Sequence, residues 1–401
     1  MTNQEKEGRA RQWISALCDI PERFAGTVSE YAAAEKVGGW MRDLGVSQVT
    51  TEAVVSRPHT GWALALHAGV ALVGLCWGGF TGVVLSLLAA WSFHREFSGQ
   101  PLLLSRLLPC SPSLNVVGRS GPEGATRRIV LSAHIDTAQA GWLFSPRLAD
   151  TFARGARGRQ EVSRTAKTPP GPLALPRALV LGAAALTLFS WMGAQGFLFG
   201  IAVLVVIAGL GLTALLTLQW ANSHATPGAN DNASAVASML TCAETLLANA
   251  PADLELWIVG TGAEEVGCRG MWGFVERRLD WDRDSTFYVN FECTGGGSLH
   301  YIRTEGVLGK SGYPPDLVEL ARRETRGGDY GDITPTDLLA ATDGHVPAHY
   351  GYPTLSLISL EANGVPRNYH RPEDTVDALD LGMVVRAADF GAAVARRAVT
   401  G

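Results

Sequence analysis

Residues 129–136 read Ile-Val-Leu-Ser-Ala-His-Ile-Asp, an uncharged run that ends in an imidazole and a carboxylate. Such a run is typical of a buried strand, which would deliver His134 at its carboxyl end. Two later segments follow the same plan. The apolar stretch 254–259 leads to Glu264-Glu265, and the stretch 286–291 leads directly to Glu292. Polar groups at the carboxyl ends of strands predict a largely parallel sheet with a site along one edge.

The rest of the chain alternates between the helical and the strand pattern. We therefore predict an α/β fold, with a mostly parallel mixed sheet flanked by helices and two inserted apolar helical hairpins. Helices are expected over residues 9–17, 29–44, 231–248, 270–279, 315–323 and 379–397, and strands over 46–55, 114–117, 129–133, 254–259, 286–291, 299–302 and 354–358.

Two long apolar runs interrupt this pattern. Residues 61–93 contain no Asp, Glu, Lys or Arg, and residues 178–220 carry no charge. Because a bilayer crossing takes about 20 apolar residues, the second run fits two spans with a turn at 193–196. The first run, with Gly78-Gly79 near its middle, fits one long crossing or two short or re-entrant helices, and we predict a hairpin. A buried cap or a dimer interface in a water-soluble enzyme is the alternative.

These patterns divide the chain into six segments. They are 1–60, 94–144 and 221–401 for the catalytic domain, 61–93 and 178–220 for the two apolar hairpins, and 145–177 for a basic, Pro-rich segment. Charged residues make up 18% of the chain, below the roughly 25% usual for soluble domains, while hydrophobic residues reach 47%. The deficit is local, which favours membrane contact. A net charge of −5 speaks against a nucleic-acid partner.

Each polar motif has an ordinary structural explanation as well as a chemical one. His134 and Asp136 could be a satisfied core pair, or Asp136 could orient the ring of a metal-binding His134. Asp231 follows a Gly-Ala-Asn turn and could simply cap a helix. Glu264 and Glu265 could form a solvated acidic turn. Adjacent carboxylates repel, however, so a division of labour is attractive: one binds metal, and the other takes the proton of the attacking water.

Two further motifs complete the set. Glu292 ends a buried strand, where a carboxylate is costly unless it is paired or coordinated. His370 follows Tyr369 in a loop, and Asp374 or Thr375 could cap the next helix. Carboxylate and imidazole ligands without cysteine suit catalytic zinc with an open position. The motifs occur together and in this order, which indicates a zinc hydrolase more strongly than any one of them.

The order of these motifs resembles that of the zinc aminopeptidase family, which includes bacterial leucyl aminopeptidases, glutamate carboxypeptidase and glutaminyl cyclase. The resemblance covers residues 8–55, 112–136 and 222–400. It implies the zinc-peptidase fold and two Zn²⁺ ions. Its implied metal ligands are His134, Asp231, Glu265, Glu292 and His370. Asp231 would bridge both ions, His134 and Glu292 would complete one site, and Glu265 and His370 the other.

The resemblance also implies the remaining roles. Glu264 would be the general base, Asp136 the partner of His134, and Tyr369 a group that steadies the oxyanion. Asp343 matches a loop acid near the site, and a plain turn residue is its alternative. The chain departs from the family in three ways. Glu292 stands where Asp is common, 97 positions separate His134 from Asp231 (231 − 134), and Gly344 is an extra residue in the Asp343 loop.

The inserts are constrained by the site. If His134 and Asp231 share a metal pair, the chain between them must leave and return to the same side of any membrane. We therefore expect a multi-pass membrane protein. Arg and Lys residues of 145–177, together with His94, Arg95 and Arg106, lie on the catalytic side, whereas the hairpin tips carry no charge. The positive-inside rule then places the catalytic domain in the cytoplasm.

The expected function is a membrane-associated zinc metallopeptidase, an aminopeptidase first of all, acting on peptides or peptide-like and amphipathic substrates. The expected partners are the substrate and the lipid bilayer, with oligomerisation through the apolar inserts as an option. Alternatives are a glutaminyl-cyclase-like acyltransferase with one zinc, a carboxypeptidase or amidohydrolase, and a non-enzymatic protein with a relict site. A carboxypeptidase would need an Arg for the substrate carboxylate, and Arg269, Arg303 and Arg367 are the candidates.

Overall fold

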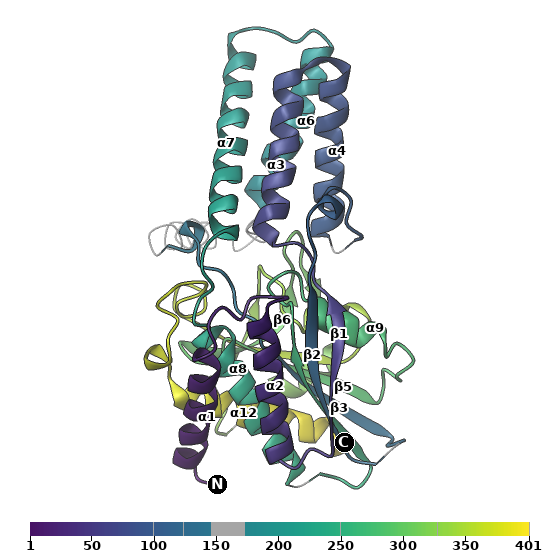
Figure 1. Cartoon of the computed structure of the whole chain (residues 1–401). Helices are drawn as coiled ribbons and strands as arrows, with labels where there is room; N and C mark the ends of the chain where they lie inside the picture. Colours follow the sequence, from purple (N-terminus) through teal and green to yellow (C-terminus); the bar gives the residue numbers. More distant parts are fainter. Residues whose placement is uncertain (99, 123, 146–172, 249, 327, 401) are drawn as a thin grey trace.

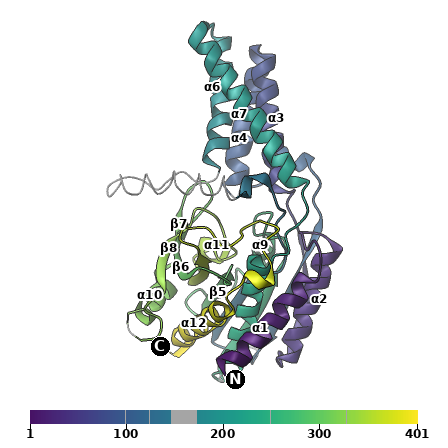
Figure 2. The ribbon, with the colours of Figure 1, turned by 90° about the vertical axis from the view of Figure 1, so that its left-hand side faces the viewer.

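The computed structural model describes residues 1–98, 100–122, 124–145, 173–248, 250–326 and 328–400. An α/β part holds the sheet and both chain termini, and a bundle formed by helices α3, α4, α6 and α7 stands on one end of it (Figure 1). In the view turned by 90°, the bundle again lies above the sheet (Figure 2). Most of the basic segment 145–177 lies outside the described residues.

The sheet has nine strands in the order β1-β2-β4-β3-β5-β9-β6-β7, with β8 paired to β6. The strands are β1 Gln48–Val55, β2 Pro112–Ser120, β3 Arg127–His134, β4 Leu254–Thr261, β5 Thr286–Glu292, β6 Ser298–Glu305, β7 Ser311–Gly312, β8 Thr334–Asp337 and β9 Thr354–Leu360. The central strands β4, β3, β5 and β9 are mutually parallel. The predicted mixed sheet with a parallel centre is therefore confirmed.

Helices cover the sheet and supply most of the core. They are α1 Asn3–Cys18, α2 Val28–Asp43, α8 Ala235–Leu247, α9 Arg269–Glu276, α10 Pro315–Glu324, α11 His345–His349 and α12 Leu381–Thr400. Helices α1, α8 and α12 bury Leu17, Leu240 and Phe390 in one cluster with Phe291 of β5. Gly391 permits this approach, because a Cβ there would lie 2.8 Å from the Phe291 ring.

The two apolar runs form the bundle. The first gives α3 Thr60–Trp77 and α4 Gly79–Phe97, and the second gives α6 Ala174–Trp191 and α7 Phe197–Ala221. The first run is thus two helices with a break at Gly78, and α4 extends beyond the apolar run to Phe97. By length and composition, α3, α6 and α7 could each cross a membrane. At about 1.5 Å per residue they span roughly 27 to 37 Å, against about 30 Å of bilayer hydrocarbon.

Each hairpin leaves and re-enters the α/β part at two neighbouring points of the chain, which we call its neck. In the first neck, Ser56 N donates to Ser111 O at 2.9 Å, just beyond the pairing of β1 with β2. In the second neck, Ala140 N donates to His224 O at 2.9 Å. In each neck the outgoing and returning chain segments are therefore hydrogen-bonded to each other. The turns of both hairpins lie at the far end of the bundle (Figure 1).

Some local structure differs from the sequence prediction. Helix α8 begins at Ala235 rather than Asp231, because residues 229–234 form a wide turn in which Asp231 has non-helical backbone angles. Strands β7 and β8 and helix α11 were not predicted. Strand β8 reads Thr-Pro-Thr-Asp, and its proline and exposed side chains give no alternating pattern.

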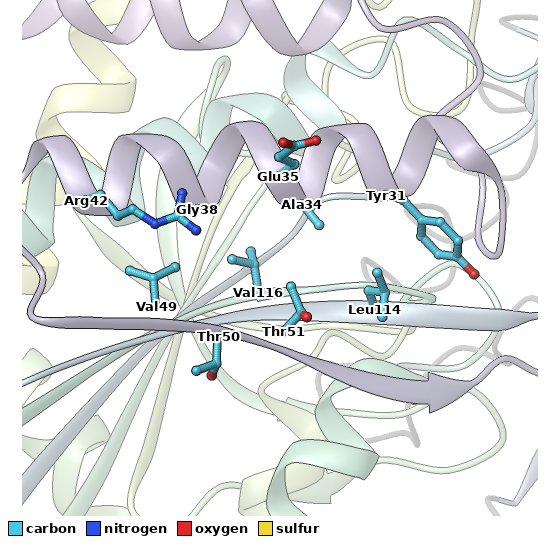
Figure 3. A pocket seen from close by; sticks show the side chains of 10 residues that line it. All are labelled: Tyr31, Ala34, Glu35, Gly38, Arg42, Val49, Thr50, Thr51, Leu114 and Val116. Atoms are coloured by element: carbon cyan, nitrogen blue, oxygen red, sulfur yellow. The ribbon is translucent and has the colours of Figure 1, made fainter.

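A hollow of about 340 Å³ lies between α2 and the outer strands β1 and β2 (Figure 3). Its lining includes Glu35 and Arg42 of α2 and Val49 of β1. None of the candidate metal ligands lines it, so the chemistry of the polar motifs has to be sought elsewhere in the fold.

Candidate metal centre

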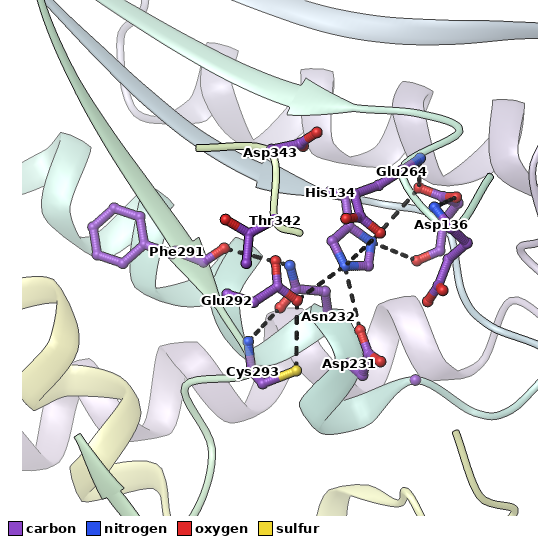
Figure 4. Close-up of polar contacts among 12 residues, drawn as sticks. His134, Asp136, Asp231, Asn232, Glu264, Phe291, Glu292, Cys293, Thr342 and Asp343 are labelled. Atoms are coloured by element: carbon purple, nitrogen blue, oxygen red, sulfur yellow. Dashed lines mark hydrogen bonds and ion pairs between the residues drawn. The ribbon is translucent and has the colours of Figure 1, made fainter. Parts of the chain in front are cut away.

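The parallel strands bring the polar motifs together at one edge of the sheet. His134 is the last residue of β3 and pairs with Thr261, the last residue of β4. Glu292 is the last residue of the neighbouring strand β5. The side chains of His134 and Glu292 converge with that of Asp231 in Figure 4. The sequence argument from strand ends thus identified residues that are neighbours in space.

The carboxylate of Asp231 lies between the two histidines. Its Oδ1 is 3.3 Å from His134 Nε2, and its Oδ2 is 3.3 Å from His370 Nε2. Glu292 Oε1 lies 3.3 Å from His134 Nε2, and Glu265 Oε2 lies 3.3 Å from His370 Nε2. The five predicted ligands therefore form two sets of three that share Asp231.

These distances fit two zinc ions. For tetrahedral zinc with bonds of about 2.0–2.1 Å, neighbouring ligand atoms lie about 3.3 Å apart. Several buried ligand atoms have no hydrogen-bond partner among the described residues: Asp231 Oδ2, Glu265 Oε1, Glu292 Oε2 and His370 Nε2. A buried carboxylate without a partner is costly, and a divalent cation would offset that cost at each set. Glu292 has a longer side chain than the Asp that is common at this position, and its carboxylate still lies 3.3 Å from His134 Nε2.

Glu264 belongs to neither ligand set but lies next to both. Its Oε2 is 3.9 Å from His134 Nε2, and its Oε1 accepts a hydrogen bond from the thiol of Cys268 at 3.4 Å. Burial raises the pKa of Glu264 well above its usual range, and the charges of Glu292 and Glu265 raise it further, while His134 opposes them. A carboxylate held there can accept a proton from a water between the two ligand sets.

The contact between Asp136 and His134 differs from the expected one. His134 Nδ1 lies 3.1 Å from the backbone carbonyl of Asp136, whereas the Asp136 carboxylate is farther, at 3.6 Å. The two carboxylate oxygens instead accept hydrogen bonds from the backbone N–H groups of Glu264 and Glu265, at 3.1 and 3.2 Å. Asp136 orients the ring through its main chain and fixes the adjacent glutamates with its side chain.

Tyr369 and Asp343 lie close to the centre in different ways. The ring of Tyr369 stacks on His370, with centroids 3.8 Å apart. Asp343 is fully buried, and its Oδ2 accepts a hydrogen bond from the Thr261 hydroxyl. Burial raises the pKa of Asp343 to about 7, although the Thr261 hydrogen bond lowers it. Asp343 also lies beside Glu264 and Cys268, and ligand atoms of the three residues are within 4.8 Å of one another.

Comparison with known proteins agrees with this geometry. Residues 217–395 match peptidase family M28. This part of the chain is similar to family M28 and carries Asp231, Glu264, Glu265, Glu292 and His370. No curated protein sequence matches the chain significantly.

Solved structures resemble nearly the whole fold. The zinc aminopeptidase BSAP from Bacillus subtilis is 15% identical, with a TM-score of 0.54, and covers 98% of this chain and 94% of its own. The aminopeptidase from Aneurinibacillus sp. strain AM-1 is 14% identical, with a TM-score of 0.55 and coverage of 98% and 93%. Porphyromonas gingivalis glutaminyl cyclase is 13% identical, with a TM-score of 0.51 and coverage of 98% and 97%. At these identities the likeness establishes the fold.

Three buried residues that support the candidate metal centre were not singled out from sequence. Asp374 accepts hydrogen bonds from the backbone N–H groups of Asn230 and Asp231, at 2.7 and 3.1 Å. Glu30 of α2 accepts one from Ala263 N at 2.9 Å. Arg23 donates to backbone carbonyls on both sides of the second neck, those of Ile135 and Gly228. A charged residue that serves backbone groups leaves no local pattern, and Asp374 instead resembled a helix cap.

Aromatic rings connect the candidate metal centre to the base of the bundle. The ring of Phe144 lies 4.5 Å from that of His370 and 5.3 Å from that of Trp220, in the last turn of α7. Trp220 Nε1 donates to Gln139 O at 3.0 Å, across the second neck. Phe144 and Trp220 are both half-buried. The side of the site that faces the bundle is therefore apolar.

Proposed function

We propose that the protein is a membrane-anchored metallopeptidase that holds two zinc ions and hydrolyses peptide bonds. The position of Asp231 carries this proposal, because its two carboxylate oxygens face two different histidines, each 3.3 Å away. A single-metal site would have no use for a carboxylate divided in this way. The match of residues 217–395 to peptidase family M28 supports metal-dependent hydrolysis as the reaction class.

In this proposal, His134, Asp231 and Glu292 hold one ion, and Asp231, Glu265 and His370 hold the other. The ions would supply Lewis acidity and lower the pKa of water towards neutrality. Glu264, whose carboxylate lies 3.9 Å from His134 Nε2, takes a proton from the attacking water and passes it to the leaving amine. Asp136 keeps Glu264 in place through the backbone hydrogen bond at 3.1 Å.

Tyr369 is proposed to steady the oxyanion that forms when water adds to the scissile carbonyl. Its phenol ring is stacked on the imidazole of His370, a proposed metal ligand. Burial raises its pKa well above the usual range, and the charges of Asp231 and Glu265 add to that effect. A phenol that stays protonated can donate a hydrogen bond to the developing negative charge.

Metal analysis combined with one substitution tests the proposal. Purified protein should contain about two zinc ions per chain, and Glu264→Gln should retain both while turnover falls by about 10²–10⁴-fold. Asp231→Ala is the matched opposite and should lose metal as well as activity. Full activity in Glu264→Gln would refute the assigned base, and a zinc-free active protein would refute the reaction class.

We further propose that the substrate is cut at its amino end. Two of the three arginines that could bind a substrate carboxylate are already paired. Arg303 contacts Asp337 at 3.0 Å, and Arg367 contacts Glu361 at 2.6 Å. Arg269, next to Cys268, remains as the arginine that a carboxypeptidase would use. Peptides blocked at one end or the other separate the two specificities.

A glutaminyl-cyclase-like acyl transfer is the second candidate, because the fold covers 97% of the Porphyromonas gingivalis enzyme. The divided ligand set argues against it, since we expect a cyclase of this kind to work with one zinc. Incubation with a peptide that begins with glutamine distinguishes the two. Loss of ammonia with a cyclised product would support the cyclase, and release of free glutamine would support the peptidase.

Membrane anchoring is proposed from the surface of the bundle. Its outer residues include Trp77, Phe197 and Leu198, whose side chains are 73%, 83% and 79% exposed. Exposed apolar surface on this scale marks contact with a membrane or another protein. His94, Arg95 and Arg177 lie at the catalytic end of the bundle. By the positive-inside rule, their position supports a cytoplasmic catalytic part. Oligomer contacts through the bundle are the competing use of this surface.

Fractionation tests this part of the proposal. The protein should sediment with membranes and should need detergent for extraction, and quantitative recovery in the soluble fraction would refute anchoring. The apolar wall of Phe144 and Trp220 then suggests that amphipathic peptides reach the site from beside the membrane. Cleavage of such peptides in vesicles, compared with polar peptides of equal length, measures that preference.

A further inference from the structure

A groove of about 340 Å³ runs along the base of the bundle between α4 and α6. Its lining is formed by Leu87, Ala90, Trp91, Phe93 and His94 of α4 and by Arg177, Val180 and Leu181 of α6. Deeper in the bundle the two helices are joined by a hydrogen bond between Ser86 Oγ and Thr187 Oγ1, at 3.2 Å. The groove is thus an external furrow on a closed helix pair.

The two ends of the groove differ in chemistry. His94 and Arg177 lie at its catalytic end, in the last turn of α4 and the first turn of α6. Leu87 lies seven residues before His94, about 10 Å farther along the bundle. Leu87 and Leu181 are 49% and 47% exposed, so the far part of the groove presents an open apolar wall.

The catalytic end of the groove also has the features of a membrane boundary. Trp91 is 56% exposed, and the guanidinium of Arg95 lies 5.4 Å from the centre of its ring. Tryptophan and arginine gather at this level in membrane proteins, where apolar and polar surroundings meet. None of the residues that line the groove is acidic.

We propose that this groove binds one anionic phospholipid, with its phosphate on Arg177 and His94 and an acyl chain along Leu87 and Leu181. The inference rests on the membrane anchoring proposed above. The groove has Arg177 and His94 at its catalytic end and an apolar wall beyond them. It therefore matches a lipid whose anionic headgroup lies at that end and whose acyl chain runs along the wall. Attraction of cationic side chains to anionic headgroups supplies the selectivity, and burial of the acyl chain supplies the retention.

Native mass spectrometry of the full-length protein tests the site. The protein is extracted in detergent and offered equal amounts of phosphatidylglycerol and phosphatidylcholine. We expect one retained phosphatidylglycerol per chain, with phosphatidylcholine retained at least about fivefold less. Arg177→Gln should lower the retained phosphatidylglycerol by about fivefold. Arg106→Gln removes the same charge from an exposed position outside the groove, and should leave retention unchanged.

A second variant tests the apolar part. Leu181→Gln should lower retention of both lipids, because it places an amide against the acyl chain while the cationic end stays intact. Equal retention of the two lipids by the wild-type protein, or unchanged retention in Arg177→Gln, would overturn the lipid site while leaving membrane anchoring in place. Recovery of the protein without detergent would overturn both proposals.

Discussion

The carboxylate of Asp374 holds the backbone of Asp231: the Asp231 N–H donates a hydrogen bond to Asp374 Oδ2 at 3.1 Å. The other oxygen accepts from Asn230 N at 2.7 Å, so one buried side chain fixes the turn that presents the bridging ligand. Asp374 touches no metal position itself. It determines instead where both oxygens of Asp231 can lie, and with them the relation between the two ligand sets.

Replacing Asp374 should therefore weaken metal binding. Asp374→Ala frees two buried N–H groups and loosens the turn of Asp231, and we expect zinc affinity to fall by about 10–100-fold. Competition with a chromophoric chelator measures the affinity. Asp377→Ala is the matched control, because Asp377 is exposed and pairs with Arg11 on the surface. Equal affinities in the two variants would contradict the role given to Asp374.

Removal of metal should destabilise the α/β part. The ligand sets bury the carboxylates of Asp231, Glu265 and Glu292 close together, and without a metal ion only the imidazoles of His134 and His370 oppose their repulsion. With zinc at about 100 times its dissociation constant, the expected loss on chelation is about 2.7 kcal/mol, or about 5–10 °C in Tm. Thermal unfolding in detergent measures it. Glu264→Gln should show the same drop, since Glu264 is not a proposed ligand.

The buried acid Glu305 should make stability depend on pH. Burial raises its pKa to about 8, while hydrogen bonds from Tyr313 and Thr342 lower it. The folded protein therefore binds one proton more than the unfolded chain between about pH 4.5 and 8. Stability from this group is present below pH 4.5 and is lost as pH rises to about 8, at up to about 1.4 kcal/mol per pH unit.

Glu305→Gln isolates this contribution, because the amide resembles the protonated acid. The difference in unfolding free energy between variant and wild type should grow in favour of the variant from pH 5 to 8 and then level off. Urea unfolding at several pH values measures the difference. Glu319→Gln is the control, since Glu319 is a surface residue paired with Arg322. A pH-independent difference for Glu305→Gln would mean that Glu305 is ionised in the folded state.

Substrate polarity should show that Arg269 is not a carboxylate anchor. We expect cleavage of peptides with a free amino end and an amidated carboxyl end, and no cleavage after acetylation of the amino end. Arg269→Gln should change kcat/KM by no more than about twofold. Liquid chromatography of the products measures both. A large rise in KM for free-carboxyl peptides in Arg269→Gln would identify a carboxypeptidase instead.

Much of the fold could be predicted because its strands are short apolar runs that end in polar residues. The runs before His134 and Glu292 are buried on both sheet faces, so they contain almost no polar positions to confuse the pattern. Strand β8 is different, because it is exposed and contains Pro335. Its place depends on pairing with β6, which is a tertiary contact that local sequence does not encode.

The site divides in the same way. Its five candidate ligands follow strand ends or turns in a fixed order, and the structure brings all of them together. The supporting contacts could not be predicted, because they join distant segments through the backbone. Glu30 lies 233 positions from Ala263, and Asp374 lies 143 positions from Asp231. Asp136 shows the same limit, since its carboxylate serves the backbone of two glutamates rather than the neighbouring imidazole.

The two necks have a consequence for how the protein can be taken apart. At the first neck Ser56 and Ser111 are hydrogen-bonded neighbours, and at the second Ala140 and His224 are. Each hairpin is therefore an elongated loop whose two ends already meet, so a short turn could rejoin the chain in its place. The bundle could therefore be deleted without separating the chain segments of the α/β part. Replacing each hairpin by a short turn is a rational route to an enzyme without the bundle, whose metal centre can be studied in water.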